Sequence, residues 1–161
     1  MSVDVILEDE RWAELHLSDL ATRAVAEVLT HFDMAQPDFE VTVLGCDDAR
    51  ISALNASFRE TARATNVLSW PSAERGAAIA GETPEIPREP GELGDIAMAY
   101  ETCQREAADQ GKPIEQHILH LIVHGVLHLL GYDHVRSEDG DLMESHEIAI
   151  LAQLGVPDPY L

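Results

Sequence analysis

The chain has 161 residues, the length of one ordinary domain, and 45% of them are hydrophobic, which is ample for a single core. Its 30 acidic residues against 10 basic ones give a formal charge of -20, and a surface of that charge repels polyanions at long range. Composition alone therefore argues against a nucleic-acid-binding protein, and a phosphate ligand would need a local cluster of positive charge.

No segment has the features of a targeting or membrane-spanning sequence. The N-terminus lacks a basic region followed by a long apolar run, and no stretch reaches the roughly 18 apolar residues of a membrane span. Cys46 and Cys103 lie far apart and form no C-x-x-C pair, so we expect two buried free thiols. These features predict a cytoplasmic protein.

Hydrophobic spacing alternates between the periods of strands and helices along the chain. Leu20, Ala24 and Val28 recur every four residues, as on one face of a helix with Ser18 as its N-cap. Asp47 and Asp48 can cap a second helix. The expected strands lie at 3–7, 39–44, 66–70 and 96–99, and the expected helices at 18–32, from 47 onward, 100–110, 113–130 and 138–154.

Residues 71–93 contain four prolines with several glycines and acids, so we expect a long loop there, mobile rather than a linker between domains. Strands and helices are interspersed on both sides of it. The sequence predicts a single domain over 1–161 of the α/β class, α+β type. Its one small mixed four-stranded sheet would pack with about five helices and carry a zinc site at the end of a central helix.

Three histidines fall within the eleven residues HGVLHLLGYDH, 124–134. On a helix, residues four apart have Cβ atoms about 5–6 Å apart, so His124 and His128 can point the same way. Gly131 can take the left-handed conformation that ends a helix and reverses the chain. His134 can then reach the same ion, and the spacing predicts one metal ion per chain on His124, His128 and His134.

Three imidazoles leave an open coordination position, as in catalytic zinc sites. Imidazole donors favour zinc, with nickel or iron as alternatives. Zinc proteases with related spacing carry a glutamate base directly after the first histidine, whereas this chain has Gly125. That difference counts against proteolysis.

Other polar residues near this motif have two possible readings. His117 and His120 share its helix face and either line the site or lie on the surface. Asp133 either accepts the second N–H of a ligand histidine or is a turn residue facing solvent. The remaining histidines, His16, His31 and His146, are expected to be structural.

Arg59 and Arg63 lie four residues apart in an acidic chain and could form a basic spot suited to phosphate. For Arg63 we favour the alternative of a solvated side chain paired with Glu60 or another acid.

The chain resembles the YbeY family of bacterial endoribonucleases and rRNA maturation factors. The family pattern H-G-x-L-H-L-x-G-Y-D-H is present unbroken at 124–134. The resemblance extends over nearly the whole chain, with two departures at positions 66 and 70: Asn66 replaces the usual aspartate and Trp70 the usual phenylalanine. The other matching segments are Leu54-Asn55 with Phe58-Arg59, TNVLSWP at 65–71, LGDI at 93–96, and the ending from Met143 to Tyr160.

The resemblance implies zinc on His124, His128 and His134 and a catalytic role for Arg59. The implied activity is cleavage of single-stranded RNA in maturation of the 16S rRNA 3′ end and in ribosome quality control. The implied partners are single-stranded rRNA, the small ribosomal subunit with one of its proteins, and an Era-type GTPase, with no membrane.

We therefore expect metal-assisted phosphodiester cleavage in which Arg59 neutralises charge that builds on phosphorus. Whether water or the RNA 2′-hydroxyl attacks is left open, because the sequence shows no general base. Two alternatives remain: a ribosome-assembly adaptor with a structural metal, and a metal-dependent hydrolase of a peptide or amide bond.

Overall fold

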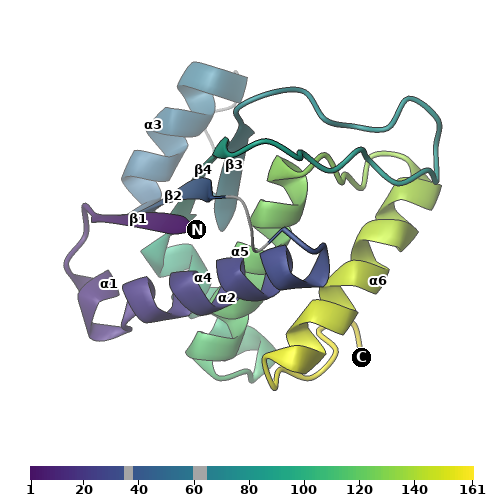
Figure 1. Ribbon diagram of the computed structural model, residues 1–161. Coiled ribbons are helices and arrows are strands. Elements are labelled where there is room, and N and C mark those ends of the chain that lie inside the picture. The colour runs from purple at the N-terminus through teal and green to yellow at the C-terminus, as the bar shows by residue number, and fades with distance from the viewer. Residues whose placement is uncertain (35–37, 60–64) are drawn as a thin grey trace.

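The computed structural model describes residues 1–34, 38–59 and 65–161, and for Phe58 and Arg59 the backbone alone. The described residues form one mixed four-stranded sheet in the order β1-β2-β4-β3 (Figure 1). β1 (Ser2–Leu7), β2 (Phe39–Cys46) and β4 (Gly91–Ala99) run in parallel, and β3 (Val67–Pro71) is antiparallel to β4. The helices are α1 (Arg11–Glu14), α2 (Leu17–His31), α3 (Asp48–Arg59), α4 (Tyr100–Gln110), α5 (Ile114–Leu129) and α6 (Ser137–Gln153).

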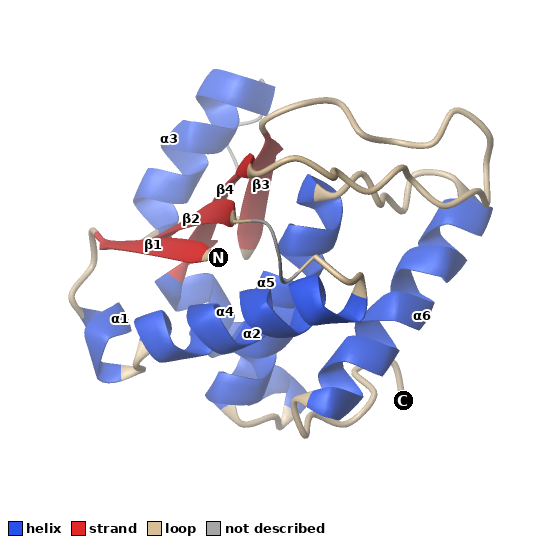
Figure 2. Cartoon of the chain, in the orientation of Figure 1, coloured by secondary structure: helices blue, strands red, loops and turns tan. Residues whose placement is uncertain are grey.

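The two faces of the sheet carry separate hydrophobic clusters, as expected when successive side chains point to opposite faces. Ile96 and Met98 of β4 belong to the main core, whereas Ala97 and Ala99 belong to a smaller cluster. Helices α2 and α5 pack on the main core, and α3 covers the smaller cluster through Ile51. Figure 2 shows α3 on one side of the sheet and α2 and α5 on the other. The predicted α+β fold is confirmed.

Helix α5 is the central helix, because it contacts the sheet, α2, α4 and α6. Most of its residues are buried, including Ile118, Ile122 and Val126. It lies close against the sheet at Gly125, where an added Cβ would be 3.0 Å from Ile96 Cδ1 of β4. A glycine at this position therefore lets the histidine-bearing helix lie close against the sheet.

The helix ends agree with the sequence in part. Asp47 caps α3, since its carboxylate accepts the backbone N–H of Arg50 at 2.8 Å. Ser18 as the cap of α2 is wrong: the helix begins at Leu17 after His16, which has the left-handed φ of 55°. The short helix α1 was not expected. It buries Trp12 completely, and the indole donates to the carbonyl of Cys46 at 2.8 Å.

The long loop joins β3 to β4 but is shorter than expected. The predicted bounds of 71–93 are too wide, because Pro71 belongs to β3 and the chain pairs with β2 from Gly91 onward. Hydrogen bonds attach the loop to α5 and to the start of α6, where Arg136 donates to the carbonyl of Ala77 at 2.8 Å. Arg75 donates to the carbonyl of Leu129 at 2.9 Å, at the end of α5. Near α6, the N–H of Gly81 donates to Asp139 at 2.9 Å. The mobility of the loop stays a prediction.

Both cysteines are free and buried, as expected. Burial raises the pKa of the Cys46 thiol to about 12 and also raises that of Cys103. Because the thiolate is the reactive form, we expect neither cysteine to react with an alkylating agent at pH 8 in the folded protein. Mass spectrometry should show two alkylations per chain after unfolding in guanidinium. Rapid alkylation of the native protein would contradict this prediction.

Candidate metal centre in an open cleft

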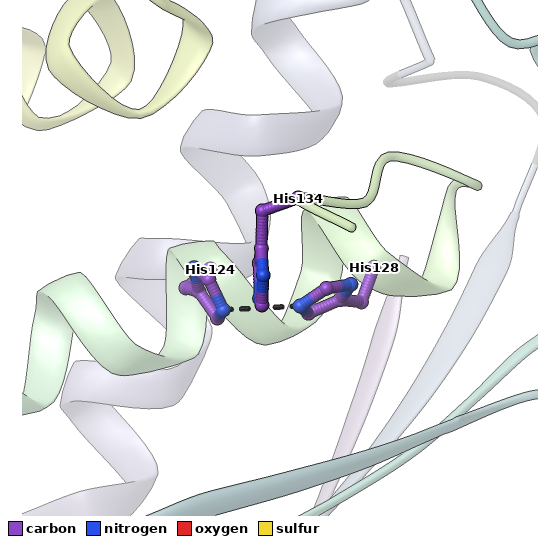
Figure 3. Close-up of side chains that lie close together, drawn as sticks. All are labelled: His124, His128 and His134. Atoms are coloured by element: carbon purple, nitrogen blue, oxygen red, sulfur yellow. Dashed lines mark hydrogen bonds between the residues drawn. The ribbon is translucent and has the colours of Figure 1, made fainter. Parts of the chain in front are cut away.

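Three histidines converge where α5 ends and the chain turns back. His124 and His128 lie one turn apart on α5, and His134 reaches them from the return (Figure 3). One nitrogen from each ring lies within 4.8 Å of the others. The centroid of the His134 ring lies 5.4 Å from that of the His124 ring and 5.1 Å from that of the His128 ring. The structure thus brings together the three residues that the sequence predicted as ligands.

The turn that brings His134 back is a helix-ending motif built on Gly131. The N–H of Tyr132 donates to the carbonyl of Leu127 at 3.0 Å, and that of Gly131 donates to His128 at 3.0 Å. Gly131 has a φ of 102°, and an added Cβ would lie 2.4 Å from the carbonyl oxygen of Arg75. Glycine is therefore required here for both conformation and space, as the sequence predicted for the turn.

In His124 and His128, the hydrogen bond of Nδ1 determines that Nε2 faces the centre of the cluster. His128 Nδ1 lies 2.9 Å from the carbonyl oxygen of Tyr132, and His124 Nδ1 lies 2.9 Å from Glu147 Oε1. A carbonyl and a carboxylate can only accept, so each Nδ1 donates and each neutral ring has a bare lone pair on Nε2. The two Nε2 atoms face one another at 3.0 Å, along the dashed line of Figure 3.

This arrangement fits a bound cation. Two ring nitrogens at 3.0 Å need a proton or a metal ion between their lone pairs. Nitrogens bound tetrahedrally to one zinc ion at 2.0–2.1 Å would be roughly 3.3 Å apart, close to the separation seen here. Burial, together with His124 and His134, lowers the pKa of His128 to about 4, so this ring is neutral and able to donate its lone pair at pH 7.

Glu147 of α6 is a functional candidate that the sequence analysis missed. Its carboxylate is 1% exposed and accepts from His120 Nε2 at 2.7 Å, His124 Nδ1 at 2.9 Å and the Tyr160 hydroxyl at 2.7 Å. Burial by itself raises the pKa of Glu147, but these three hydrogen bonds outweigh it and lower the pKa to about 2. A signal was present in the sequence, because Glu147 follows Met143 and precedes Ile150 on the buried stripe of its helix.

The structure also decides between the readings of the neighbouring residues. Asp133 is an exposed turn residue that accepts the backbone N–H of His134 at 2.7 Å. His120 touches the cluster through Glu147, and His117 is buried against Glu106 at 3.0 Å, so neither is a plain surface histidine. His31 and His146 form a separate pair between α2 and α6, with His31 Nε2 at 2.9 Å from His146 Nδ1.

The three histidines lie in an open cleft of about 1370 Å³. Its walls come from β3, from the loop after it and from the start of α6. Among the described residues, the arginines that line the cleft are Arg75 and Arg136. Arg59 ends α3, but its side chain lies outside the described residues, as does Arg63 altogether. The catalytic role of Arg59 therefore stays a prediction.

Asn66 lines the same cleft and is hydrogen-bonded to an acidic side chain. Its amide nitrogen donates to Glu106 Oε1 at 3.0 Å, and its amide oxygen accepts the N–H of Val67 at 2.7 Å. An aspartate in this position would place two carboxylates at hydrogen-bonding distance. The asparagine and Glu106 are therefore complementary in this chain.

Comparison with known proteins identifies the family. The family model described as endoribonuclease YbeY matches residues 4–155. The chain belongs to the YbeY family. The protein named endoribonuclease YbeY from Cereibacter sphaeroides is 58% identical over 98% of each chain. YbeY proteins of the same name are 51% identical in a Jannaschia species, over 99% of this chain and all of that one, and 42% identical in Rhodopseudomonas palustris, over 99% and 90%.

A solved structure shares the YbeY fold seen here. The solution structure of TM1509 from Thermotoga maritima superposes with a TM-score of 0.58 and 20% sequence identity, over 95% of this chain and 91% of that one. At that identity the likeness concerns the fold. Among the described residues, no helix is long and apolar enough to cross a membrane.

Proposed function

We propose that this chain is a metal-dependent endoribonuclease that cuts single-stranded RNA, with one zinc ion held by His124, His128 and His134. The observation that carries the proposal is the convergence of bare imidazole nitrogens on one point in the lining of an open cleft. The relatives named endoribonuclease YbeY, matched over nearly the full chain, support RNA as the substrate.

The chemistry follows from what each group can offer. A zinc ion, when bound, supplies the positive charge that polarises a phosphate oxygen or a water molecule. Arg59 would neutralise the charge that builds on the phosphorus oxygens. Of the acids in the cleft lining, Asp139 is engaged by the N–H of Gly81 and by the Arg136 guanidinium, so it is not free to act as a base.

The attacking group can be identified from the products. Attack by the RNA 2′-hydroxyl leaves a 2′,3′-cyclic phosphate, whereas attack by water leaves a linear phosphate. Mass spectrometry of the fragments from a short single-stranded RNA separates the two routes.

The net charge of -20 affects the affinity of the protein for RNA. Binding of RNA through counterion release needs positive charge, which is scarce in this chain. We therefore propose weak affinity for naked RNA and delivery in the cytoplasm by partners on the small ribosomal subunit, a ribosomal protein and an Era-type GTPase. The substrate would be the single-stranded region at the 3′ end of 16S rRNA, where unstacked nucleotides can enter a cleft that a duplex cannot.

The structure speaks against the peptide-hydrolase alternative. In zinc proteases the residue after the first histidine is the glutamate base. Here that residue is Gly125, which faces Ile96 of the sheet rather than the cleft. A carboxylate at this position would point into the core, so the helix has no place for that base.

Replacing Arg59 by alanine should lower the rate of RNA cleavage by about 100-fold, because removing one group that stabilises transition-state charge costs roughly 10²–10³ in rate. The bound metal and the melting temperature should stay as in the wild type. The matched control is Arg50→Ala on the same helix, which removes an exposed ion pair with Glu8 at 3.2 Å. Equal cleavage by both variants would remove Arg59 from the mechanism, and a protein with no cleavage to lose would favour the adaptor alternative.

A further inference from the structure

We propose that Glu147 is the positioning residue of the metal centre: it fixes His124 in the Nδ1–H form and so aims the Nε2 lone pair at the ion. The inference rests on the proposed function, since it concerns the same cluster. Nothing in the histidine motif requires Glu147, which comes from a different helix and lies 23 residues after His124.

The carboxylate of Glu147 is in direct contact with the ring of His124. Glu147 Oε1 lies 2.9 Å from His124 Nδ1. An ionised carboxylate has no proton to give, so the proton of this bond belongs to the imidazole. The other ring nitrogen is then bare, and it is the nitrogen that faces His128 Nε2 at 3.0 Å.

The carboxylate of Glu147 is held in one orientation by its other contacts. Its other oxygen, Oε2, accepts from His120 Nε2 at 2.7 Å and from the Tyr160 hydroxyl at 2.7 Å. The ring of Tyr160 also packs edge-on against His120, with centroids 5.7 Å apart. Both carboxylate oxygens therefore accept hydrogen bonds from the protein. Because Glu147 is only 1% exposed, bulk water does not compete for these bonds.

The two histidine rings of α5 are oriented by different kinds of acceptor. His128 is oriented by a backbone carbonyl, that of Tyr132, which belongs to the turn itself. His124 lies one turn earlier, where the helix carbonyls are used within the helix, so its second nitrogen needs a side-chain acceptor. Glu147 supplies this acceptor from α6. Its negative charge also makes the ring a stronger electron-pair donor.

The wild-type protein allows a direct test without any substitution. In the metal-free protein at pH 8, long-range ¹H–¹⁵N NMR of the histidine rings should show His124 as the Nδ1–H tautomer. An Nε2–H tautomer, or an equal mixture of the two, would overturn the proposal.

Variants provide the second test, with affinity for Zn²⁺ measured by competition with a chromophoric chelator. Glu147→Gln removes the negative charge and replaces one acceptor oxygen by an NH₂ group, which would face a donor of a neighbouring side chain. This variant should weaken zinc binding by roughly 10- to 100-fold. Glu147→Asp keeps the charge but falls short of His124 Nδ1. It should lose nearly as much affinity as the glutamine variant, together with the fixed tautomer.

The matched control is Glu144→Gln, an exposed glutamate one turn earlier on α6, which should bind zinc as the wild type does. If Glu147→Asp binds zinc like the wild type, the residue acts by charge alone and the positioning role is refuted. If the wild type itself binds no zinc, the proposed function fails first. If the wild type binds zinc and both Glu147 variants bind equally well, the inference alone fails.

Discussion

Replacing His128 by alanine is expected to abolish stoichiometric metal binding and to lower RNA cleavage by more than roughly 100-fold. Two histidine nitrogens hold a metal ion more weakly than three. Loss of a ligand should reduce metal affinity by more than the 10- to 100-fold typical of losing a residue that only orients a ligand. Metal analysis of the purified protein and cleavage of a single-stranded RNA on the same samples measure both effects. The fold should persist at a cost of about 1 kcal/mol, the typical effect of a single substitution.

The matched control is His31→Ala. His31 belongs to the separate pair with His146, at the contact between α2 and α6. It should keep one metal ion per chain and full cleavage. The proposed function is wrong if the His128 variant still cuts RNA at the wild-type rate after dialysis against a chelator. A metal bound without cleavage in the wild type would instead support the adaptor alternative.

Gly125→Glu restores the glutamate of the zinc proteases, and we expect it to destroy the fold rather than create a protease. An added Cβ would already lie 3.0 Å from Ile96 Cδ1, and overpacking of this kind costs about 1–3 kcal/mol. The carboxylate beyond it would be buried between the helix and the sheet without a partner, at a further cost of several kcal/mol. The sum is comparable to the whole stability of a typical domain, about 5–15 kcal/mol.

Thermal unfolding followed by circular dichroism measures this effect. The matched control is Gly140→Ala in α6, where the added Cβ would be 3.5 Å from the Cα and Cβ atoms of His134, an ordinary contact. That control should gain up to about 1 kcal/mol, because alanine favours a helix over glycine. A Gly125→Glu protein that melts at the wild-type temperature, or that cleaves a peptide library, would contradict the packing of α5 on β4 described here.

The parts of the molecule that follow from local rules could be predicted from the sequence. The strands follow from alternation of side chains along the chain, and the end of α5 follows from the conformational freedom of Gly131. The cluster of three histidines could be predicted for the same reason, since a helix turn and a glycine turn bring His124, His128 and His134 together in space. Each of these features depends on short stretches of chain.

The features that were missed depend on packing between distant segments. Helix α1 has four residues, too few to show a period, and it forms where Trp12 is buried against the carbonyl end of β2. Glu147 has the sequence context of a core position, and its acceptor role depends on how α6 packs against α5. The β3–β4 loop looked longer because Gly91 and Glu92 resemble turn residues, whereas pairing with β2 places both of them in the sheet.

The hydrogen bonds that anchor the β3–β4 loop differ in their dependence on pH. Arg75 binds the carbonyls of Leu129 and Leu93, and neither an arginine nor a carbonyl changes its charge over the range in which proteins are folded. Asp139 holds the other end, and the N–H of Gly81 and the Arg136 guanidinium keep the pKa of this carboxyl below its usual value. A carboxylate of this kind contributes stability above its unfolded pKa and loses it as the pH falls through the folded one. Acidification therefore weakens the contact of Gly81 with Asp139 alone, because the Arg136 guanidinium at the start of α6 also binds the carbonyls of Ala77 and Ala78. With arginine–carbonyl contacts at both α5 and α6, the wall that the loop gives the cleft should persist in acid.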